Sequence, residues 1–192
     1  MRPGRQENGE KSCGATSRLF PSSNKVDLAE FGVSQAMSGW SSSCTAAAVK
    51  HSPSRMHWGC FSWQGVGPIV PIKGSITGTS YVGILQKHAT LTFMCMFPRR
   101  NGWFQHDNAR PHTAKISLEF LEGSGMRVLD WPAQSPDLNP IENLWAIVKR
   151  SIRQREKPPS NVGELEKYVQ AAWKAIPLTT IRNLIDSMPQ RI

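Results

Sequence analysis

From Met56 onward, short apolar runs alternate with segments of helical periodicity, and this alternation most limits the folds open to the chain. The apolar runs are bounded by Gly, Pro or a charged residue, as strands usually are, and they predict strands at 56–63, 69–72, 103–107 and 127–131. The amphipathic segments predict helices at 79–90, 114–122, 140–154, 162–175 and 179–188. Strands that alternate with helices build a sheet covered by helices, so the sequence predicts an α/β fold.

The charge balance favours a polyanionic partner. Lys plus Arg total 23 against 14 Asp plus Glu, which gives a formal net charge of +9, and nucleic acid is the commonest partner of so basic a chain. The four Cys form no CxxC pair, which excludes a zinc finger and argues against a disulfide scaffold. No apolar run approaches the roughly 18 residues of a membrane span, and the first residues lack the apolar stretch of a signal peptide. We therefore expect a soluble, intracellular protein with no membrane partner.

Asp107 directly follows the apolar run predicted as a strand. Ligand sites in open α/β sheets gather at the carboxyl ends of strands, so this position suits chemistry. Asp107-Asn108 followed by Arg-Pro also fits an ordinary turn, and the sequence leaves both interpretations open. His106 and His112 flank the acid, and we expect them to hold the turn by hydrogen bonds rather than to act on phosphate or water.

Glu142 lies near the start of the next predicted helix. Asn139 suits the N-cap, Pro140 the first helical position and Glu142 the third, where its carboxylate can accept a bond from the cap residue's N–H. Glu142 also shares a helix face with Lys149 and Arg153, and a carboxylate beside cations suits a metal-bound phosphodiester site. Helical geometry does not decide between the cap and the metal ligand.

The same helix ends in a basic run over residues 149–157, with five cations against one anion. We interpret these cations as contacts to the DNA backbone, which are salt-dependent and indifferent to base sequence, with a merely solvated helix end as the alternative. The predicted DNA-binding residues are Lys149, Arg150, Arg153, Arg155 and Lys157.

Three blocks of the sequence resemble the catalytic domain of Tc1/mariner-type transposases. They are Trp58-Gly59-Cys60-Phe61, residues 105–113 (QHDNARPHT) and residues 131–145 (WPAQSPDLNPIENLW). Between Asp107 and Glu142 lie 34 residues, 108 to 141, the interval that names the Tc1-like DD34E group. The resemblance runs from about Val49 to the carboxyl terminus.

This resemblance implies an RNase H-like mixed sheet flanked by helices, with a site where two Asp and one Glu hold two divalent cations. Mg²⁺ is the usual ion and Mn²⁺ its substitute. Asp107 is then the second catalytic carboxylate and metal ligand, and Glu142 is the third. The implied reaction is hydrolysis of a phosphodiester at the transposon end, followed by attack of the freed 3′-hydroxyl on target DNA at a TA step. The implied partner is DNA, the implied compartment is the nucleus, and a homodimer is compatible with the family.

The chain departs from the family at its amino end. Nothing before Val49 resembles the paired helix-turn-helix modules that read transposon ends, and no apolar strand that ends in the first catalytic Asp is identifiable. Asp27 is the nearest substitute, although a single apolar residue precedes it. We therefore expect a divergent, disordered leader over 1–48, a catalytic core over 49–157 with its first-strand region degenerate or missing, and a helical carboxyl-terminal extension over 158–192. Asp137 is a further acid, but Ser-Pro-Asp is also a common turn.

Three functional classes remain open after the sequence alone. An active DNA strand transferase requires Asp27 or another acid to complete the metal site. A catalytically dead DNA-binding remnant requires only the basic face. A non-functional relic of a transposon is the third, because the strand that bears the first Asp belongs at the centre of such a sheet and its loss would impair folding.

Overall fold

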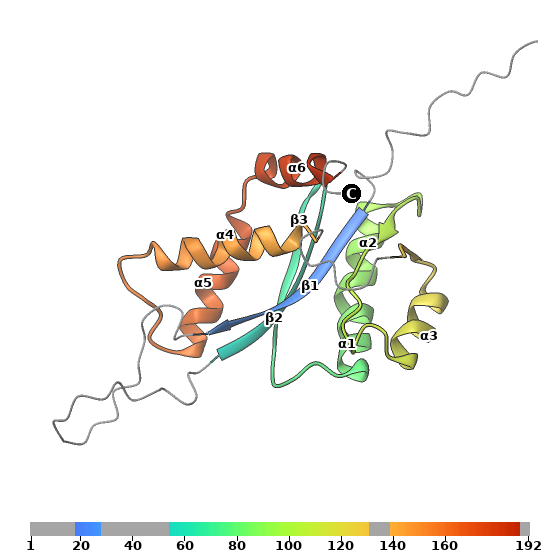
Figure 1. The fold of residues 1–192 in the computed structure, drawn as a ribbon, viewed down its shortest axis with the longest axis horizontal. Coiled ribbons are helices and arrows are strands. Elements are labelled where there is room, and N and C mark those ends of the chain that lie inside the picture. The colour runs from blue at the N-terminus through green and yellow to red at the C-terminus, as the bar shows by residue number, and fades with distance from the viewer. Residues whose placement is uncertain (1–17, 28–53, 131–138, 189–192) are drawn as a thin grey trace, which may run out of the picture.

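The computed structural model describes residues 18–27, 54–130 and 139–188. Within these ranges the strands form one mixed sheet in the order β3-β2-β1-β4-β5 (Figure 1). The central strands β1 and β2 are antiparallel, as are β2 and β3, whereas β4 runs parallel to both β1 and β5. The strands are β1 Arg18–Asp27, β2 Ser54–Ser62, β3 Gly65–Ile72, β4 Trp103–Phe104 and β5 Arg127–Val128. This is the mixed sheet that the family resemblance implies.

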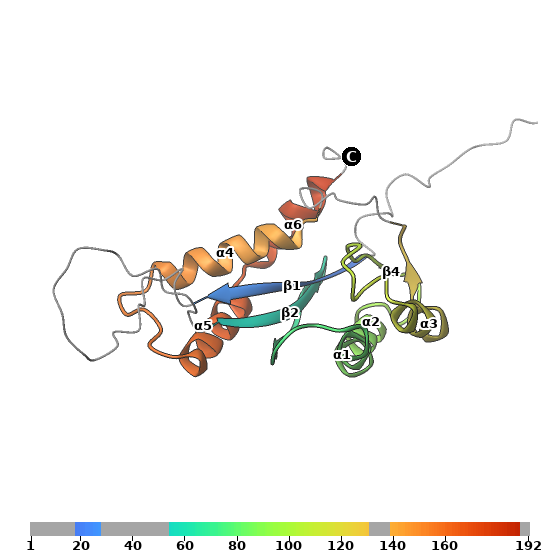
Figure 2. The same ribbon diagram turned by 60° about the horizontal axis from the view of Figure 1, so that its bottom comes forward.

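The helices cover both faces of this sheet. They are α1 Gly78–Ile84, η2 Leu85–Ala89, α2 Thr90–Met96, α3 Lys115–Ser124, α4 Ile141–Arg153, α5 Val162–Lys174 and α6 Leu178–Asp186. Figure 2 shows α4 and α1 on opposite sides of β1 and β2. None of the helices in the described part of the chain is long and apolar enough to cross a membrane.

Each face of the sheet is covered by its own cluster of buried side chains. Phe20 and Phe61 belong to the cluster under α4, α5 and α6, whereas their neighbours Leu19 and Cys60 belong to the cluster under α1, α2 and α3. Successive side chains of a strand point to opposite faces, so this alternation is what a sheet covered on both sides requires. The apolar faces of the helices therefore position α4 directly against β1.

Strand β1 differs from the sequence prediction. The expected disordered leader over 1–48 contains a strand at residues 18–27, and the first-strand region is neither missing nor peripheral, because β1 lies between β2 and β4. The sequence pattern of β1 does not indicate a strand. Leu19, Phe20 and Val26 are fully buried, but Pro21 and four polar residues lie between them and interrupt the apolar run. The rest of the expected leader lies outside the described residues.

Other predictions differ in detail. The helix expected at 79–90 continues through η2 and α2 to Met96. Gly125, with φ 72°, is the left-handed residue after α3, which extends to Ser124 rather than ending at the predicted residue 122. The strand predicted at 69–72 begins earlier, at Gly65, and β3 is the outer strand beside β2. These changes lengthen or shift elements without altering the α/β architecture.

Candidate functional site

Asp107 lies three residues beyond the carboxyl end of β4, because the strand predicted over 103–107 ends at Phe104. The N–H of Gln105 donates to the carbonyl oxygen of Leu19 at 2.9 Å, which holds the end of β4 against the central strand β1. Two residues later the Asp107 carboxylate accepts a bond from the N–H of Ala109 at 3.1 Å and closes a turn. The two interpretations of Asp107 are therefore compatible, because the residue both forms a turn and lies just beyond the end of a strand.

His112 fixes the direction of this carboxylate. Its Nδ1 lies 2.5 Å from Oδ1 of Asp107 and 3.2 Å from the Asp107 carbonyl oxygen. The His112 side chain is buried, and its ring centroid lies 4.2 Å from that of the fully buried Tyr81. The Asp107 side chain remains 44% exposed, so one face of the acid is open to solvent or a ligand.

The same contacts keep Asp107 ionised. Burial acts to raise the pKa of Asp107, but the hydrogen bond and charge of His112, with the Ala109 N–H and the charge of His106, outweigh it and lower that pKa below its usual range. Burial, reinforced by the charge of His112 and opposed by Asp107, lowers the pKa of His106 to about 4. At neutral pH the site thus presents a charged Asp107 beside a neutral His106.

Buried polar atoms that the sequence analysis did not identify surround Asp107. Both amide atoms of Gln105, Nδ1 of His106 and the hydroxyl of Tyr81 are buried without a hydrogen-bond partner in the described part of the chain. Buried polar groups normally have partners, so these four atoms are exceptions to that rule. Only the two histidines carried a sequence signal, because they flank the acid.

Glu142 is in the first turn of α4. The helix begins after Pro140, which has no side-chain cap bond, and the Glu142 N–H donates to the Asn139 carbonyl oxygen at 3.2 Å. Asn139 is therefore not the N-cap that the sequence predicts, and Pro140 has no N–H for Glu142 to accept from. Ile141, the residue before Glu142, lies in the same buried cluster as Phe20 of β1. Asp107 thus follows the strand that pairs with β1, and Glu142 belongs to the helix that packs on β1.

Among the described residues, the first carboxylate implied by the resemblance is not found with these two. Asp27 is the last residue of β1, in register with Ser54, and Asp137 lies outside the described residues. Among the residues that the structure describes, no group of three or more His, Cys, Asp or Glu side chains is arranged to hold a metal ion. Two carboxylates do not fit a site for a pair of Mg²⁺ ions, which need several oxygen ligands each.

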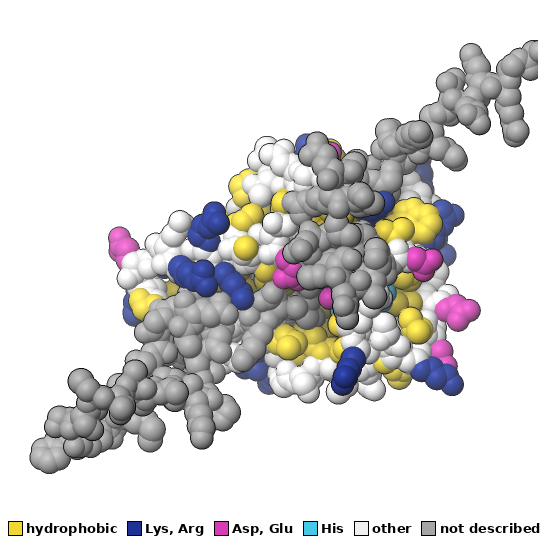
Figure 3. All heavy atoms as spheres, in the orientation of Figure 1, with side chains coloured by type: hydrophobic (Ala, Val, Ile, Leu, Met, Phe, Trp, Pro, Cys, Tyr) yellow, Lys and Arg dark blue, Asp and Glu magenta, His cyan; other side chains and the backbone are white. Residues whose placement is uncertain are grey.

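The predicted DNA-binding cations lie at the opposite end of α4 and in the loop that follows it. Arg150, Arg153, Arg155 and Lys157 are exposed and Lys149 is half-buried. The Arg155 guanidinium lies 4.1 Å from the ring centroid of Tyr168. Figure 3 shows Lys and Arg side chains gathered over α4. The basic run is therefore an accessible surface on the same helix as Glu142.

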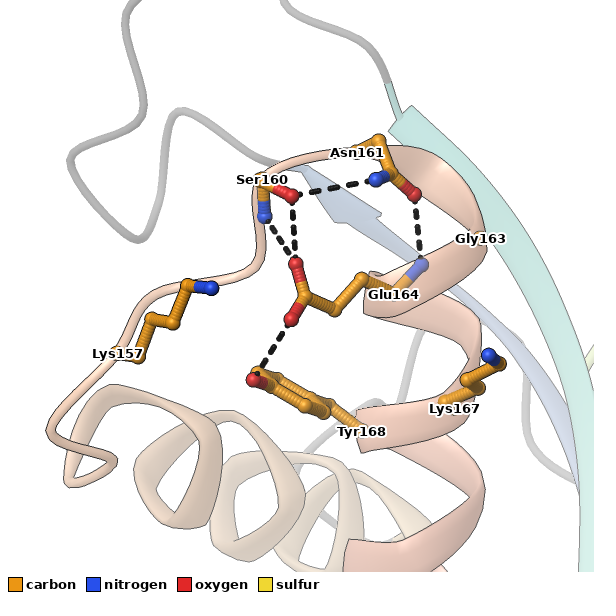
Figure 4. Close-up of a pocket in the computed structure, with 7 residues that line it drawn as sticks. All are labelled: Lys157, Ser160, Asn161, Gly163, Glu164, Lys167 and Tyr168. Atoms are coloured by element: carbon orange, nitrogen blue, oxygen red, sulfur yellow. Dashed lines mark hydrogen bonds between the residues drawn. The ribbon is translucent and has the colours of Figure 1, made fainter.

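A hollow of about 440 Å³ at the start of α5 has a structural explanation. Figure 4 shows Glu164 at its centre, where the carboxylate accepts bonds from the Ser160 hydroxyl and N–H at 2.7 Å each and from the Tyr168 hydroxyl at 3.0 Å. The Ser160 hydroxyl and N–H, with the Tyr168 hydroxyl, lower the pKa of Glu164 to about 2. This hollow is a capped helix start, and it contains neither of the candidate catalytic acids.

Replacing His112 by Phe is expected to raise the pKa of Asp107, because the ring still fills its place against Tyr81 but no longer donates to the carboxylate. The folded-state pKa of Asp107 lies below its unfolded value of about 3.9, so its contribution to stability is complete above that pH and is lost as the pH falls through the folded pKa. His112→Phe should therefore flatten the loss of stability below about pH 4.

Carboxyl ¹³C NMR titration and unfolding at several pH values would measure both effects. His88→Phe is the matched control, since His88 lies in η2 and makes none of the Asp107 contacts described above. Identical Asp107 titration curves in the wild type and His112→Phe would contradict the role assigned to His112.

Comparison with known proteins identifies similar transposases. Residues 73–166 match a family model described as DDE superfamily endonuclease. The transposable element Tcb1 transposase of Caenorhabditis briggsae is 37% identical over 145 residues, which are 74% of this chain and 52% of the relative. The transposable element Tc3 transposase of Caenorhabditis elegans is 33% identical over 137 residues, 71% of this chain and 41% of the relative.

Solved structures agree on the fold. The catalytic domain of Mos1 mariner transposase superposes with a TM-score of 0.67 at 18% identity, covering 94% of this chain and 80% of that one. A Mos1 transposase paired-end complex with left transposon end gives a TM-score of 0.71 at 21% identity over 94% of this chain and 54% of that one. The fold is therefore the RNase H-like fold of DDE nucleases.

The matched family model and this fold together define a domain of the DDE class. The chain belongs to the Tc1/mariner transposase family and carries its DDE catalytic domain. It spans about half the length of the curated Tcb1 and Tc1 relatives that it matches.

Proposed function

We propose that this domain binds DNA and acts in DNA transposition as a metal-dependent nuclease and strand transferase, with catalysis impaired by an incomplete set of carboxylates. The observation that carries the proposal is the ionised, His112-oriented Asp107 just beyond β4, beside a sheet on which the helix of Glu142 packs. Asp107 and Glu142 are the candidate catalytic residues and metal ligands. Mg²⁺, or Mn²⁺ in its place, would supply charge stabilisation to the phosphodiester, with two ions only in a complete site.

The position of the cations on α4 supports a path for DNA. Arg150 is eight residues beyond Glu142, or about 12 Å along the helix axis. One strand of a duplex advances about 3.4 Å per nucleotide, so this separation corresponds to roughly three to four nucleotides. A backbone held by Arg150 and Arg153 would therefore present a phosphodiester to the acid end of the same helix.

The other partners follow from the family. Related structures include a Mos1 transposase paired-end complex with left transposon end and a pre-cleavage Mos1 transpososome, which supports transposon-end DNA as the ligand of this domain. We extend the proposal to target DNA at a TA step, to a homodimer as the assembly and to the nucleus as the compartment. In the absence of a third acid such as Asp27, strand cleavage and transfer would be slow.

Neutralising Arg150 and Arg153 together by Gln is expected to weaken DNA binding for every sequence alike. Each lost phosphate contact should reduce the slope of log affinity against log salt by about 0.9, so the double variant should lose up to about 2. Fluorescence anisotropy with a labelled duplex at several salt concentrations would measure this.

Lys87→Gln combined with Lys115→Gln removes the same number of charges from exposed positions on η2 and α3, and serves as the control. Equal salt slopes for the two double variants would refute a DNA path along α4.

A second candidate, the catalytically dead DNA-binding remnant, is favoured by the two-carboxylate site itself. In that case the wild type and Asp107→Asn would nick supercoiled DNA equally with Mn²⁺ or Mg²⁺, whereas an impaired enzyme would lose its residual nicking in Asp107→Asn. The third hypothesis, a non-functional relic with impaired folding, loses its main argument, because β1 occupies the centre of the sheet.

A further inference from the structure

The parallel register between β1 and β4 identifies the residue of β1 that lies level with Asp107. The register pairs Arg18 with Trp103 and Leu19 with Phe104, an offset of 85 positions in both pairs. The bond from the Gln105 N–H to the Leu19 carbonyl oxygen carries the same register one residue beyond β4. With that offset, Asp107 is level with position 22 of β1, which is a serine.

Pro21 explains why the pairing stops just before this position. Leu19 directs its backbone groups toward β4, and alternate residues of a strand direct theirs to the same neighbour. The next bond of the ladder would need an N–H at residue 21 to donate to the Gln105 carbonyl oxygen, and Pro21 has none. The chain after Gln105 is thus released to form the Asp107 turn beside position 22.

The alternation of β1 also assigns position 22 to the face that carries α4. Phe20 and Val26 both belong to the buried cluster under α4, whereas Leu19 belongs to the opposite cluster. The β1–β2 register runs without a shift from Phe20 to Asp27, so even-numbered positions of β1 share one face. Position 22 therefore lies on the face of β1 that α4 covers, at the level of Asp107.

Asp27 does not meet either condition. It lies five residues beyond position 22, about 16 Å along an extended strand. It also has the opposite parity, and its backbone is paired with Ser54 at the far end of the β1–β2 ladder. Carboxylates that bind a common Mg²⁺ approach it to about 2.1 Å, and two such ions are about 4 Å apart, so ligands cannot be so widely separated.

We propose that Ser22 occupies the position of the first metal-binding carboxylate, and that this neutral hydroxyl is what leaves the site short of a ligand. The inference rests on the proposed function, because it assumes that Asp107 and Glu142 form a divalent-cation site. It replaces Asp27 as the candidate first position. It also implies that the defect is a single substitution within an otherwise assembled sheet.

The test measures Mn²⁺ binding by the full chain and its variants. Electron paramagnetic resonance detects the free ion and so reports how much is bound. Ser22→Asp is expected to bind Mn²⁺ at least about tenfold more tightly than the wild type, because added carboxylate ligands raise the affinity of oxygen-ligand sites. Mn²⁺ should then also raise the melting temperature of Ser22→Asp more than that of the wild type. Its Mn²⁺-dependent nicking of supercoiled DNA should increase.

Two matched controls decide the position. Ser23→Asp adds the same charge one residue along the strand, at the opposite parity, and should leave the Mn²⁺ affinity close to that of the wild type. Asp27→Asn should also leave it unchanged. An equal gain from Ser22→Asp and Ser23→Asp, or a loss of Mn²⁺ binding in Asp27→Asn, would overturn the proposal.

A measurement on the unmutated chain covers the case in which Ser22→Asp does not fold. Fe²⁺ with ascorbate and hydrogen peroxide generates hydroxyl radicals that cleave the backbone near a bound ion, and mass spectrometry locates the cuts. We expect cleavage near residues 22 and 107, abolished in Asp107→Asn. Cuts centred on residues 27 and 54 would reject Ser22.

The two proposals fail in different ways. If Ser22→Asp gains no Mn²⁺ affinity while DNA binding still depends on Arg150 and Arg153, the assignment of Ser22 is wrong and the DNA-binding function stands. If DNA binding is also independent of these cations, the proposed function fails as well.

Discussion

Phe20→Ala is expected to lower the free energy of unfolding by about 3–5 kcal/mol, as is typical of a buried Phe replaced by Ala. Phe20 is fully buried, its ring lies 4.9 Å from that of Phe61, and it belongs to the cluster shared with α4. Domains of this size are stable by only about 5–15 kcal/mol, so the loss would remove a large fraction of the total. Urea unfolding followed by circular dichroism would measure it.

The prediction separates a central strand from a disordered leader. A Phe in a disordered segment would contribute almost nothing, and Phe20→Ala would then unfold with the wild-type midpoint. Leu91→Ala is the control, because Leu91 is 60% exposed on α2 and its loss should change stability by no more than about 0.5 kcal/mol. Equal, small effects of both variants would mean that β1 does not hold the sheet together.

The sequence identifies the acids more readily than the strand that positions them. Asp107 and Glu142 lie in segments whose chemistry is local, since a turn after an apolar run and a Pro before a helix are visible within a few residues. β1 has no such local pattern, because Pro21 and the polar residues after it interrupt its alternation. Its place is fixed instead by pairing with β2 and β4, which are distant in the sequence.

The site likewise combines contacts that a local pattern predicts with contacts that only tertiary packing creates. That His112 contacts Asp107 could be expected from their separation by one turn of chain, whereas the packing of Tyr81 against His112 joins α1 to the loop after β4. The level of position 22 relative to Asp107 depends on strand register, which no local pattern specifies. Tertiary pairing therefore determines which residues complete the site, and the motif alone does not.

Trp173 holds α5 against the sheet through three contacts. Its side chain is 1% exposed, and its ring centroid lies 5.0 Å from that of Trp145 on α4. Its Nε1 donates to the carbonyl oxygen of Gly67 in β3 at 3.0 Å. A Cβ built on Gly59 of β2 would lie 3.1 Å from the Trp173 ring, so the indole packs directly on the glycine backbone. The Trp-Gly-Cys-Phe block thus owes its glycine to this tryptophan.

Trp173→Ala is expected to cost about 3–5 kcal/mol, since it opens a cavity between α4, α5 and β2 and leaves the Gly67 carbonyl without its donor. Gly59→Ala should cost about 1–3 kcal/mol by overpacking against the indole. Trp173→Phe removes the outer ring atoms that meet this Cβ, so in that background Gly59→Ala should be neutral or stabilising by up to about 1 kcal/mol, because alanine orders a strand better than glycine.

Urea unfolding of the wild type, both single variants and the double variant measures the coupling between Gly59 and Trp173. Residues in contact typically couple by about 0.5–3 kcal/mol, and here the sign must favour the double variant. Gly83→Ala is the control, because a Cβ there meets no atom within 4 Å, and it should add independently to Trp173→Phe. Additive effects of Gly59→Ala and Trp173→Phe would show that the indole does not rest on β2, and α5 would then need another anchor.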